Sequence, residues 1–243
     1  MLNDSNTTRR YPLRHPDNTN LHLYYGDTYA GQPLQVKVGP FVEKYLFRTE
    51  QTIGLALQQY PRVLAFRMDL RLPVGISLPE YAYTNEVMSR FIESFKAKIE
   101  HNRDKAREGN RYAHTSKVRY VWAREVGQEG GRPHYHLLFL LNRDAFYTVG
   151  RLQSASPNMI SRLEEAWASA LGLTLGEVQG LVHIPDNETY RIDRDFRERR
   201  VVGSNSKVRV DELPALFHRA SYLCKAATKS YGDRQRGFDT SKG

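Results

Sequence analysis

Residues 133–141 read Pro-His-Tyr-His-Leu-Leu-Phe-Leu-Leu, and this stretch decides the fold of the chain. Its apolar run predicts a buried β-strand that extends from Pro133 to Asn142. Because side chains alternate along a strand, His134 and His136 lie on one face and Tyr135 points to the other. Two histidines at positions i and i+2 of a strand are suitable ligands for a metal ion.

A second strand is predicted just before this one, from Lys117 to Val126, and it carries Glu125 near its end. Residues 127–132 read Gly-Gln-Glu-Gly-Gly-Arg, which is typical of a turn. A four-residue loop within this turn pairs Glu125 with His134, so that the carboxylate and both imidazoles share one face. An odd loop length moves Glu125 to the opposite face unless a β-bulge compensates. Two imidazoles and a carboxylate suit a divalent metal with open positions for a substrate.

A third motif lies near the C-terminus, where residues 211–229 predict one amphipathic helix. Asp211 is a suitable N-cap and Pro214 fits the first turn. On a helical wheel the apolar arc consists of Leu216, Phe217, Ala220, Leu223, Cys224 and Ala227. The opposite arc carries His218, Tyr222, Lys225 and Lys229. A tyrosine with lysines one and two turns away can act as a nucleophile, because a phenol of pKa about 10 needs a neighbouring cation or metal to lose its proton.

These motifs together resemble the HUH endonucleases, which nick single-stranded DNA through a phosphotyrosine link. The chain is most similar to the replication-initiator proteins of filamentous phages and related prophage elements, the inovirus gene-two protein family. The matching stretches are residues 131–136, residues 221–229 with their Tyr-x-x-Lys pattern, and the ending Tyr231 to Ser241. The resemblance covers about residues 60 to 241. The chain departs from the family in having Tyr135, rather than an aliphatic residue, between the histidines.

The resemblance implies a metal-dependent reaction that nicks and rejoins single-stranded DNA. In it, Tyr222 attacks the scissile phosphate and leaves a 5′-phosphotyrosine on the enzyme and a free 3′-hydroxyl on the DNA. Lys225 stabilises the phenolate or the charge developing at phosphorus, and Lys229 contacts a phosphate. Mg²⁺ or Mn²⁺ is held by Glu125, His134 and His136, with Asp69 as the fallback third ligand should Glu125 face away.

The order of the remaining elements predicts an α+β fold. The expected elements are a helix from Val36 to Tyr60, a strand from Arg62 to Leu72, a helix from Tyr81 to Arg107, the hairpin, a helix from Pro157 to Leu171 and a strand from Gly180 to Ile184. This β-α-β-β-α-β order predicts a split βαβ (ferredoxin- or RRM-like) antiparallel sheet with helices packed on one face. The C-terminal tyrosine-bearing helix then crosses the open face, and either the N-terminal helix or the C-terminal tail covers its apolar arc.

Two flanking regions complete the predicted organisation. Residues 1–33 are polar and are expected to form an irregular N-terminal arm, followed by a single nuclease domain at 34–243. Residues 190–209 are rich in arginine and poor in apolar residues, which predicts a loop. The side chains expected to grip DNA phosphates are Arg67 and Arg71 on the first strand and Arg197, Arg199 and Arg200 in this loop.

Composition agrees with a nucleic-acid partner. The 243 residues carry a net charge of +9, and the 15 tyrosines offer rings on which unpaired bases can stack. Cys224 is the single cysteine, so an intramolecular disulfide is excluded and a reducing cytoplasm is expected. No apolar stretch approaches the roughly 20 residues that span a bilayer, and the N-terminus lacks a signal-peptide core. We therefore expect a cytoplasmic protein without a membrane partner.

Rolling-circle replication of a phage, prophage or plasmid is the function expected from the resemblance, with single-stranded origin DNA, a host polymerase and a helicase as partners. A transposase or relaxase of the same chemistry is one alternative. Another is a non-catalytic basic nucleic-acid-binding protein of RRM-like fold, although such sheets usually expose aromatic pairs on their central strands. A structural zinc site is disfavoured, because there is one cysteine and no second histidine pair with suitable spacing.

Overall fold

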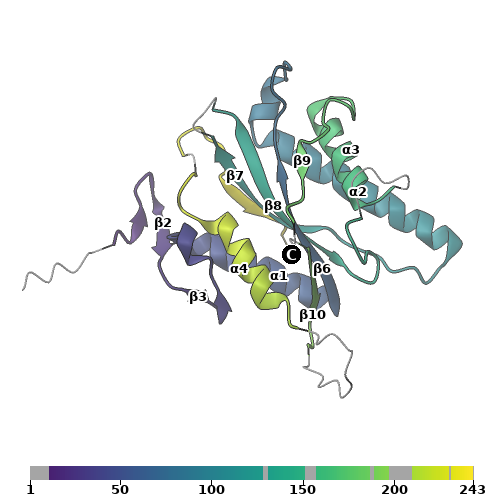
Figure 1. Ribbon diagram of the computed structural model, residues 1–243, viewed down its shortest axis with the longest axis horizontal. Helices are drawn as coiled ribbons and strands as arrows, with labels where there is room; N and C mark the ends of the chain where they lie inside the picture. The colour runs from purple at the N-terminus through teal and green to yellow at the C-terminus, as the bar shows by residue number, and fades with distance from the viewer. Residues whose placement is uncertain are drawn as a thin grey trace, which may run out of the picture.

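The computed structural model describes residues 11–127, 131–150, 157–186, 189–196, 210–229 and 231–242. Its centre is an antiparallel sheet in which the strands lie in the order β10-β6-β8-β7-β11, and β9 also pairs with β6 (Figure 1). The strands are β6 (Arg62–Leu70), β7 (Arg119–Val126), β8 (Pro133–Asn142), β9 (Val182–His183), β10 (Thr189–Asp193) and β11 (Phe238–Thr240). The chain therefore has the predicted α+β character with an antiparallel sheet.

The hairpin of β7 and β8 has the predicted register. Glu125 pairs with His134 and Val126 with Pro133. Along β8 the apolar run is buried on both sides, since Leu137 and Leu138 are each wholly inaccessible to solvent. A strand buried on both faces needs a layer of structure on each side.

Two helices cover the first face of the sheet. Helix α2 (Glu86–Gly109) follows a short 3₁₀ turn, η2 (Glu80–Tyr83), and presents a stripe of buried residues at helical spacing, which are Val87, Met88, Phe91, Ile92, Phe95 and Ile99. Helix α3 (Met159–Leu171) begins at a capping box between Asn158 and Ser161 and ends at Gly172, whose φ of 70° suits a left-handed C-cap. Both helices pack on the odd-numbered residues of β8, including Phe139.

The second face is also covered, which corrects the expectation that helices pack on one face only. Helix α1 (Glu43–Gln59) and the segment of α4 (Leu213–Ala220) and η3 (Ser221–Cys224) lie on the opposite side from α2 and α3 (Figure 1). They bury the even-numbered side chains of β8, such as Leu138 and Leu140. The physical reason is that the alternate apolar side chains of the central strands would otherwise face water. The N-terminal helix α1 packs on η3, and Phe238 of the C-terminal tail belongs to the same apolar cluster.

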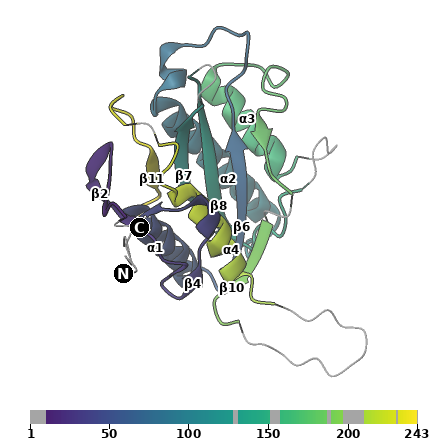
Figure 2. The same ribbon diagram turned by 60° about the vertical axis from the view of Figure 1, so that its left-hand side comes forward.

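Residues 11–33 contain strands, so the expected irregular arm is wrong for this stretch; residues 1–10 lie outside the described part. The strands are β1 (Arg14–His15), β2 (Asn18–Tyr24), β3 (Thr28–Tyr29) and β4 (Gln32–Pro33). A separate sheet joins β1, β2 and β5 (Phe41–Val42), and β5 leads directly into α1. Figure 2 shows the N-terminal strands beside α1. Strand β1 pairs with β2, and β3 pairs with β4, across short turns. Leu21 and Leu34 pack in the hydrophobic cluster on the second face of the sheet.

Three predicted elements are shorter than expected or interrupted. The Val36–Tyr60 helix is a 3₁₀ turn, η1 (Val36–Val38), then β5 and then α1, because Pro40 cannot continue a helix. The arginine-rich stretch begins with strand β10, which pairs with β6, so residues 190–193 are not loop. The tyrosine helix ends at Ala220, and Tyr222 lies in the 3₁₀ turn η3.

The second face of the sheet changes character along its strands. On β6 the inward residues pass from Val63 and Ala65 to Arg67 and Asp69, and on β8 they pass from leucines to histidines. Helix α1 covers the apolar end of this face. The polar end is left for side chains of other segments, and the candidate site lies there. None of the described helices is long and apolar enough to span a membrane.

The Cys224 thiol offers a test of this packing. It is wholly buried, and burial raises its pKa to about 12, so both access and thiolate formation are suppressed. We expect native protein to resist labelling by a thiol-reactive dye for hours at pH 8, and guanidinium-unfolded protein to label within minutes. Mass spectrometry measures the modified fraction. Rapid stoichiometric labelling of the native protein would show that η3 does not pack against α1 as described.

Candidate metal and tyrosine site

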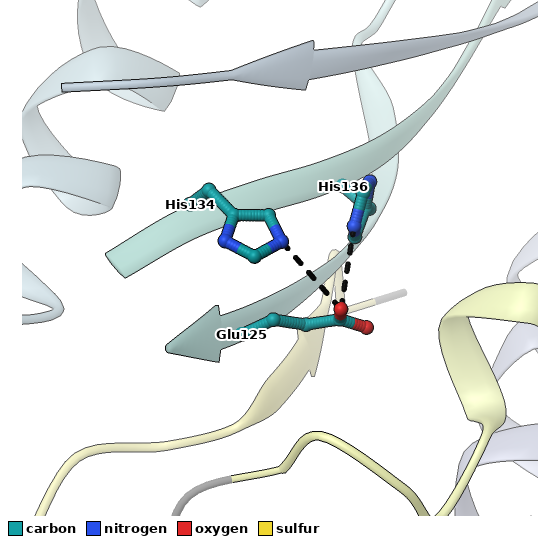
Figure 3. Close-up of side chains that lie close together, drawn as sticks. All are labelled: Glu125, His134 and His136. Atoms are coloured by element: carbon teal, nitrogen blue, oxygen red, sulfur yellow. Dashed lines mark ion pairs between the residues drawn. The ribbon is translucent and has the colours of Figure 1, made fainter. Parts of the chain in front are cut away.

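Glu125, His134 and His136 converge at the polar end of the second sheet face. One ligand atom from each lies within 4.8 Å of the others. The Oε2 atom of Glu125 is 3.5 Å from the Nε2 atom of each histidine, as the dashed lines in Figure 3 show. This convergence follows from the β7–β8 register, which sets Glu125 opposite His134.

Asp69 orients His136. Its Oδ1 atom is 2.6 Å from Nδ1 of His136, and Arg67 lies 3.3 Å from the same carboxylate oxygen. Because Nδ1 donates its proton to Asp69, the Nε2 lone pair of His136 points toward Glu125. Asp69 is thus not the third member of the cluster, which Glu125 supplies. It is instead the group that sets the tautomer of one histidine.

Neighbouring charges keep both carboxylates ionised. Burial alone raises the pKa of Glu125, but the nearby imidazoles of His134 and His136 and the charge of Lys229 outweigh burial and hold that pKa far below its ordinary value. The pKa of Asp69 is likewise lowered, because its hydrogen bond with His136 outweighs burial. Burial lowers the pKa of His136, yet Asp69 and Glu125 reverse this effect and raise it.

Tyr222 stands beside this cluster. Its ring centroid lies 5.1 Å from that of His136, nearly perpendicular to it, and its hydroxyl is 2.6 Å from Nζ of Lys225. Lys225 Nζ is in turn 3.0 Å from Oε1 of Glu125. The phenol is therefore one ammonium group away from the carboxylate that faces the histidines. Tyr222 therefore lies beside the β7–β8 hairpin, as the sequence predicts.

The N-terminal strands hold the segment that carries Lys225. Phe41 of β5 forms an antiparallel bridge with Lys225, and the Ala226 amide donates to the Pro40 carbonyl at 2.8 Å. The buried His15 accepts at Nδ1 from the Asp17 amide, so its Nε2 donates to the Ala226 carbonyl at 3.2 Å. These contacts require extended backbone at Lys225, and this is why the helix does not continue through Tyr222.

Two of the predicted DNA contacts are placed differently by the structure. Arg67 is buried, bonds to Asp69 and lies over the Tyr222 ring, so it belongs to the site rather than to an outer surface. The side chain of Lys229 is wholly buried with Nζ 3.5 Å from Oε1 of Glu125, which makes it a charge partner of Glu125 and not a surface phosphate contact. Arg71 is exposed at the end of β6. Arg197, Arg199 and Arg200 lie outside the described residues.

Two kinds of site residue are missed by the sequence patterns. The sequence predicts Asp69 only as a fallback metal ligand, whereas the pairing of β6 with β8 sets it opposite His136. The sequence predicts no role for His15 and Phe41, because their contacts with residues 225–226 join opposite ends of the chain. No local pattern signals such contacts.

Comparison with known proteins places the chain in a family. The YagK/YfjJ C-terminal domain matches residues 26–241. The chain belongs to the YagK/YfjJ C-terminal domain family. It is 30% identical over 209 residues to the uncharacterized protein YagK of Escherichia coli (strain K12), covering 84% of this chain and 95% of YagK. It is 28% identical over 212 residues to the uncharacterized protein YfjJ of the same strain, covering 84% of this chain and 97% of YfjJ. No solved structure matches it.

The cluster in this YagK/YfjJ domain has the donor set of a divalent-cation site. Within the described chain, Nε2 of His136 is buried without a hydrogen-bond partner, which is costly unless something binds there. Two imidazoles and one carboxylate leave coordination positions for other ligands. Arg67, Lys225 and Lys229 face the carboxylates of Asp69 and Glu125, so the site already has an excess of positive charge that suits an anionic ligand.

The raised pKa of His136 predicts a pH effect on the metal-free YagK/YfjJ domain. The contribution of His136 to stability is complete below its ordinary pKa of 6.5 and is lost as the pH rises through the raised folded value. In EDTA, we expect the free energy of unfolding to fall, relative to a His136→Asn variant, as the pH rises above 6.5. Guanidinium unfolding at each pH measures the difference. An unchanged difference across this range would contradict the assigned contacts with Asp69 and Glu125.

The role of Asp69 predicts an effect on metal affinity. Asp69→Asn retains the shape of the side chain but removes the charge that sets the His136 tautomer, so Mn²⁺ affinity is expected to fall about 10- to 100-fold. Isothermal titration calorimetry measures it. The control is Asp186→Asn, which alters a carboxylate outside the cluster and is expected to leave the affinity unchanged. Equal affinities for the Asp69 variant and the wild type would remove Asp69 from the site.

Proposed function

We propose that this protein is a metal-dependent single-strand DNA nicking and rejoining enzyme of the HUH type, with Tyr222 as the nucleophile. The observation that carries the proposal is the position of the Tyr222 hydroxyl. It is hydrogen-bonded to Lys225, which contacts Glu125, and the Tyr222 ring packs on His136. A nucleophile, a cation beside it and a candidate metal cluster thus meet in one place.

The topology of the sheet supports the same assignment. In the order of the chain, β6, α2, β7, β8, α3 and then β9 and β10 follow one another, while in space β8 lies between β6 and β7. We infer from this order that the core is a split βαβ sheet. The metal cluster then stands on β7 and the adjacent central strand β8, and Tyr222 approaches from a separate C-terminal segment.

Glu125, His134 and His136 are the residues that would hold Mg²⁺ or Mn²⁺, and the bound ion would supply Lewis-acid polarisation of the scissile phosphate. The protein contributes further positive charge around the same point. Lys225 and Lys229 both face Oε1 of Glu125, which leaves Oε2 directed at the histidines. One carboxylate oxygen of Glu125 therefore contacts the lysines, and the other faces the imidazoles.

In the proposed reaction, the phenolic oxygen of Tyr222 bonds to phosphorus as the bond from phosphorus to the 3′ oxygen breaks. The phenol proton passes to solvent, and the departing 3′ oxygen takes up a proton. Lys225 donates to the phenolic oxygen at 2.6 Å, so it stabilises the phenolate before attack. Because the phosphotyrosine is an ester like the bond it replaces, attack by a 3′-hydroxyl reverses the step and rejoins the strand.

An aromatic hollow next to the site supports a single-stranded substrate. It has a volume of about 700 Å³, and Tyr11, Tyr24 and Tyr25 line it together with Ala227 and Thr228 of the lysine-bearing segment. The rings of Tyr11 and Tyr25 are exposed and lie 5.1 Å apart between centroids. Unpaired bases stack on rings of this kind, whereas bases inside a duplex are not accessible to them.

A nick that leaves a 3′-hydroxyl provides a primer, which is the requirement for initiating rolling-circle replication of a phage, prophage or plasmid.

The formation of a covalent adduct tests the proposal. Purified protein is incubated with Mn²⁺ and labelled single-stranded oligonucleotides that tile the DNA on both sides of its own gene. We expect the wild type to form a DNA–protein adduct that survives denaturation, and Tyr222→Phe to form none, because the variant lacks the attacking oxygen. Peptide mapping of the adduct locates the modified residue.

Two controls separate chemistry from folding and binding. Tyr112→Phe alters an exposed tyrosine far along the chain from the site and is expected to retain full adduct formation. The double variant with alanine at His134 and His136 is expected to lose cleavage while retaining salt-sensitive DNA binding. An adduct on Tyr222→Phe would show that the nucleophile is another residue. Absence of any adduct with wild-type protein across the tiled DNA would reject the nicking function.

A further inference from the structure

A second large hollow of the molecule lies away from the candidate site. It is beside the N-terminal end of strand β7 and the C-terminal half of helix α2. It is a groove of about 870 Å³. Its walls are α2, the residues that lead into β7, and the chain end that follows β11. The proposed reaction uses none of its lining residues.

The groove is lined by cations that lack acidic partners. They are Lys96, Arg103, Arg107, Lys117, Arg119 and Lys242. In the described part of the chain none of these six forms an ion pair with a carboxylate; Arg119 bonds to the neutral amide of Gln59, and Arg103 bonds to the Asn102 amide and the Ala145 carbonyl. Three acidic residues also line the groove, and one of them, Asp239, is already paired with Arg236. The groove therefore presents uncompensated positive charge.

We propose that this groove is a second nucleic-acid-binding site, which holds the phosphate backbone of DNA outside the segment that meets Tyr222. Lys and Arg side chains bind phosphate oxygens without reading sequence, so the groove positions the DNA rather than selecting its bases. The inference rests on the proposed function only in taking DNA as the partner. It requires neither the metal cluster nor covalent chemistry.

The spread of the cations indicates an extended polyanion rather than a single phosphate. Lys96 and Arg107 are separated by three turns of α2, which is about 16 Å along the helix axis. A DNA strand presents one phosphate per roughly 3.4 Å of helix rise, so this row faces several phosphates. A single free phosphate cannot span the distance between these two cations.

The position of the groove relative to the site suits one continuous ligand. Arg119 begins β7 and Glu125 lies six residues further along the same strand, which corresponds to about 20 Å. DNA bound in the groove thus extends to the site over the length of about six nucleotides of helix rise. The same strand joins the two binding surfaces rigidly.

Binding without chemistry tests the groove. The protein carries Tyr222→Phe, EDTA removes metal, and fluorescence anisotropy follows a labelled DNA hairpin with a single-stranded extension as KCl is increased. The groove variant is Lys96→Glu with Arg107→Glu. The matched control is Lys44→Glu with Lys105→Glu, which makes the same change in net charge at exposed residues that do not line the groove.

We expect the groove variant to bind at least about tenfold more weakly than the control, with a salt slope shallower by roughly one or two. Circular dichroism and thermal unfolding check that both variants are folded. Equal affinities and slopes for the two variants would overturn the proposal. So would equally tight, groove-dependent binding of polyglutamate or of anionic phospholipid vesicles, since the groove would then not be a nucleic-acid site.

The outcome is independent of the nicking assay. If wild-type protein forms no covalent adduct but the groove variant still loses DNA affinity, the proposed reaction fails and the groove assignment stands. If adducts form and the two variants bind DNA alike, the reaction stands and the groove assignment fails.

Discussion

The buried carboxylate of Glu125 is the constraint on which the arrangement of the site depends. Its Oε2 faces His134 and His136 of β8, and its Oε1 faces Lys225 and Lys229 of the C-terminal segment. A buried charge must be paired, and removal of one partner of such a pair is strongly destabilising. Glu125 therefore ties a sheet strand to a segment a hundred residues further along the chain, and it brings Tyr222 with that segment.

The sheet makes this constraint compatible with a folded core. Its second face is apolar at one end, where α1 packs, and polar at the other, where Arg67, Asp69 and the histidines emerge. Because alternation assigns every second residue to this face, one register of the β7–β8 hairpin aligns all of the polar groups. The packing of the apolar end thus fixes the geometry of the polar end. The same strands therefore form both the hydrophobic core and the candidate site.

Much of the fold and half of the site were predictable from short-range patterns. The β8 strand has its predicted bounds, and the β7–β8 register is the one expected for a four-residue loop rather than for an odd loop. The cluster of Glu125 with two histidines followed in turn. Short-range patterns did not predict where the C-terminal helix ends, because its apolar residues keep a helical spacing beyond the last helical residue. Residues 221–229 continue the amphipathic period of the preceding helix, yet the helix ends at Ala220 because Lys225 pairs with Phe41.

The sequence by itself determined which side chains share the second face of the sheet, since the period of a strand is two and the hairpin loop sets the register. Only the tertiary structure decided that Arg67 and Lys229 are buried partners of carboxylates, that Asp69 orients His136, and that His15 and Phe41 hold the lysine-bearing segment. These contacts join residues distant in the chain. Their free energy comes from burial and charge pairing in the folded molecule, and local patterns carry no information about either.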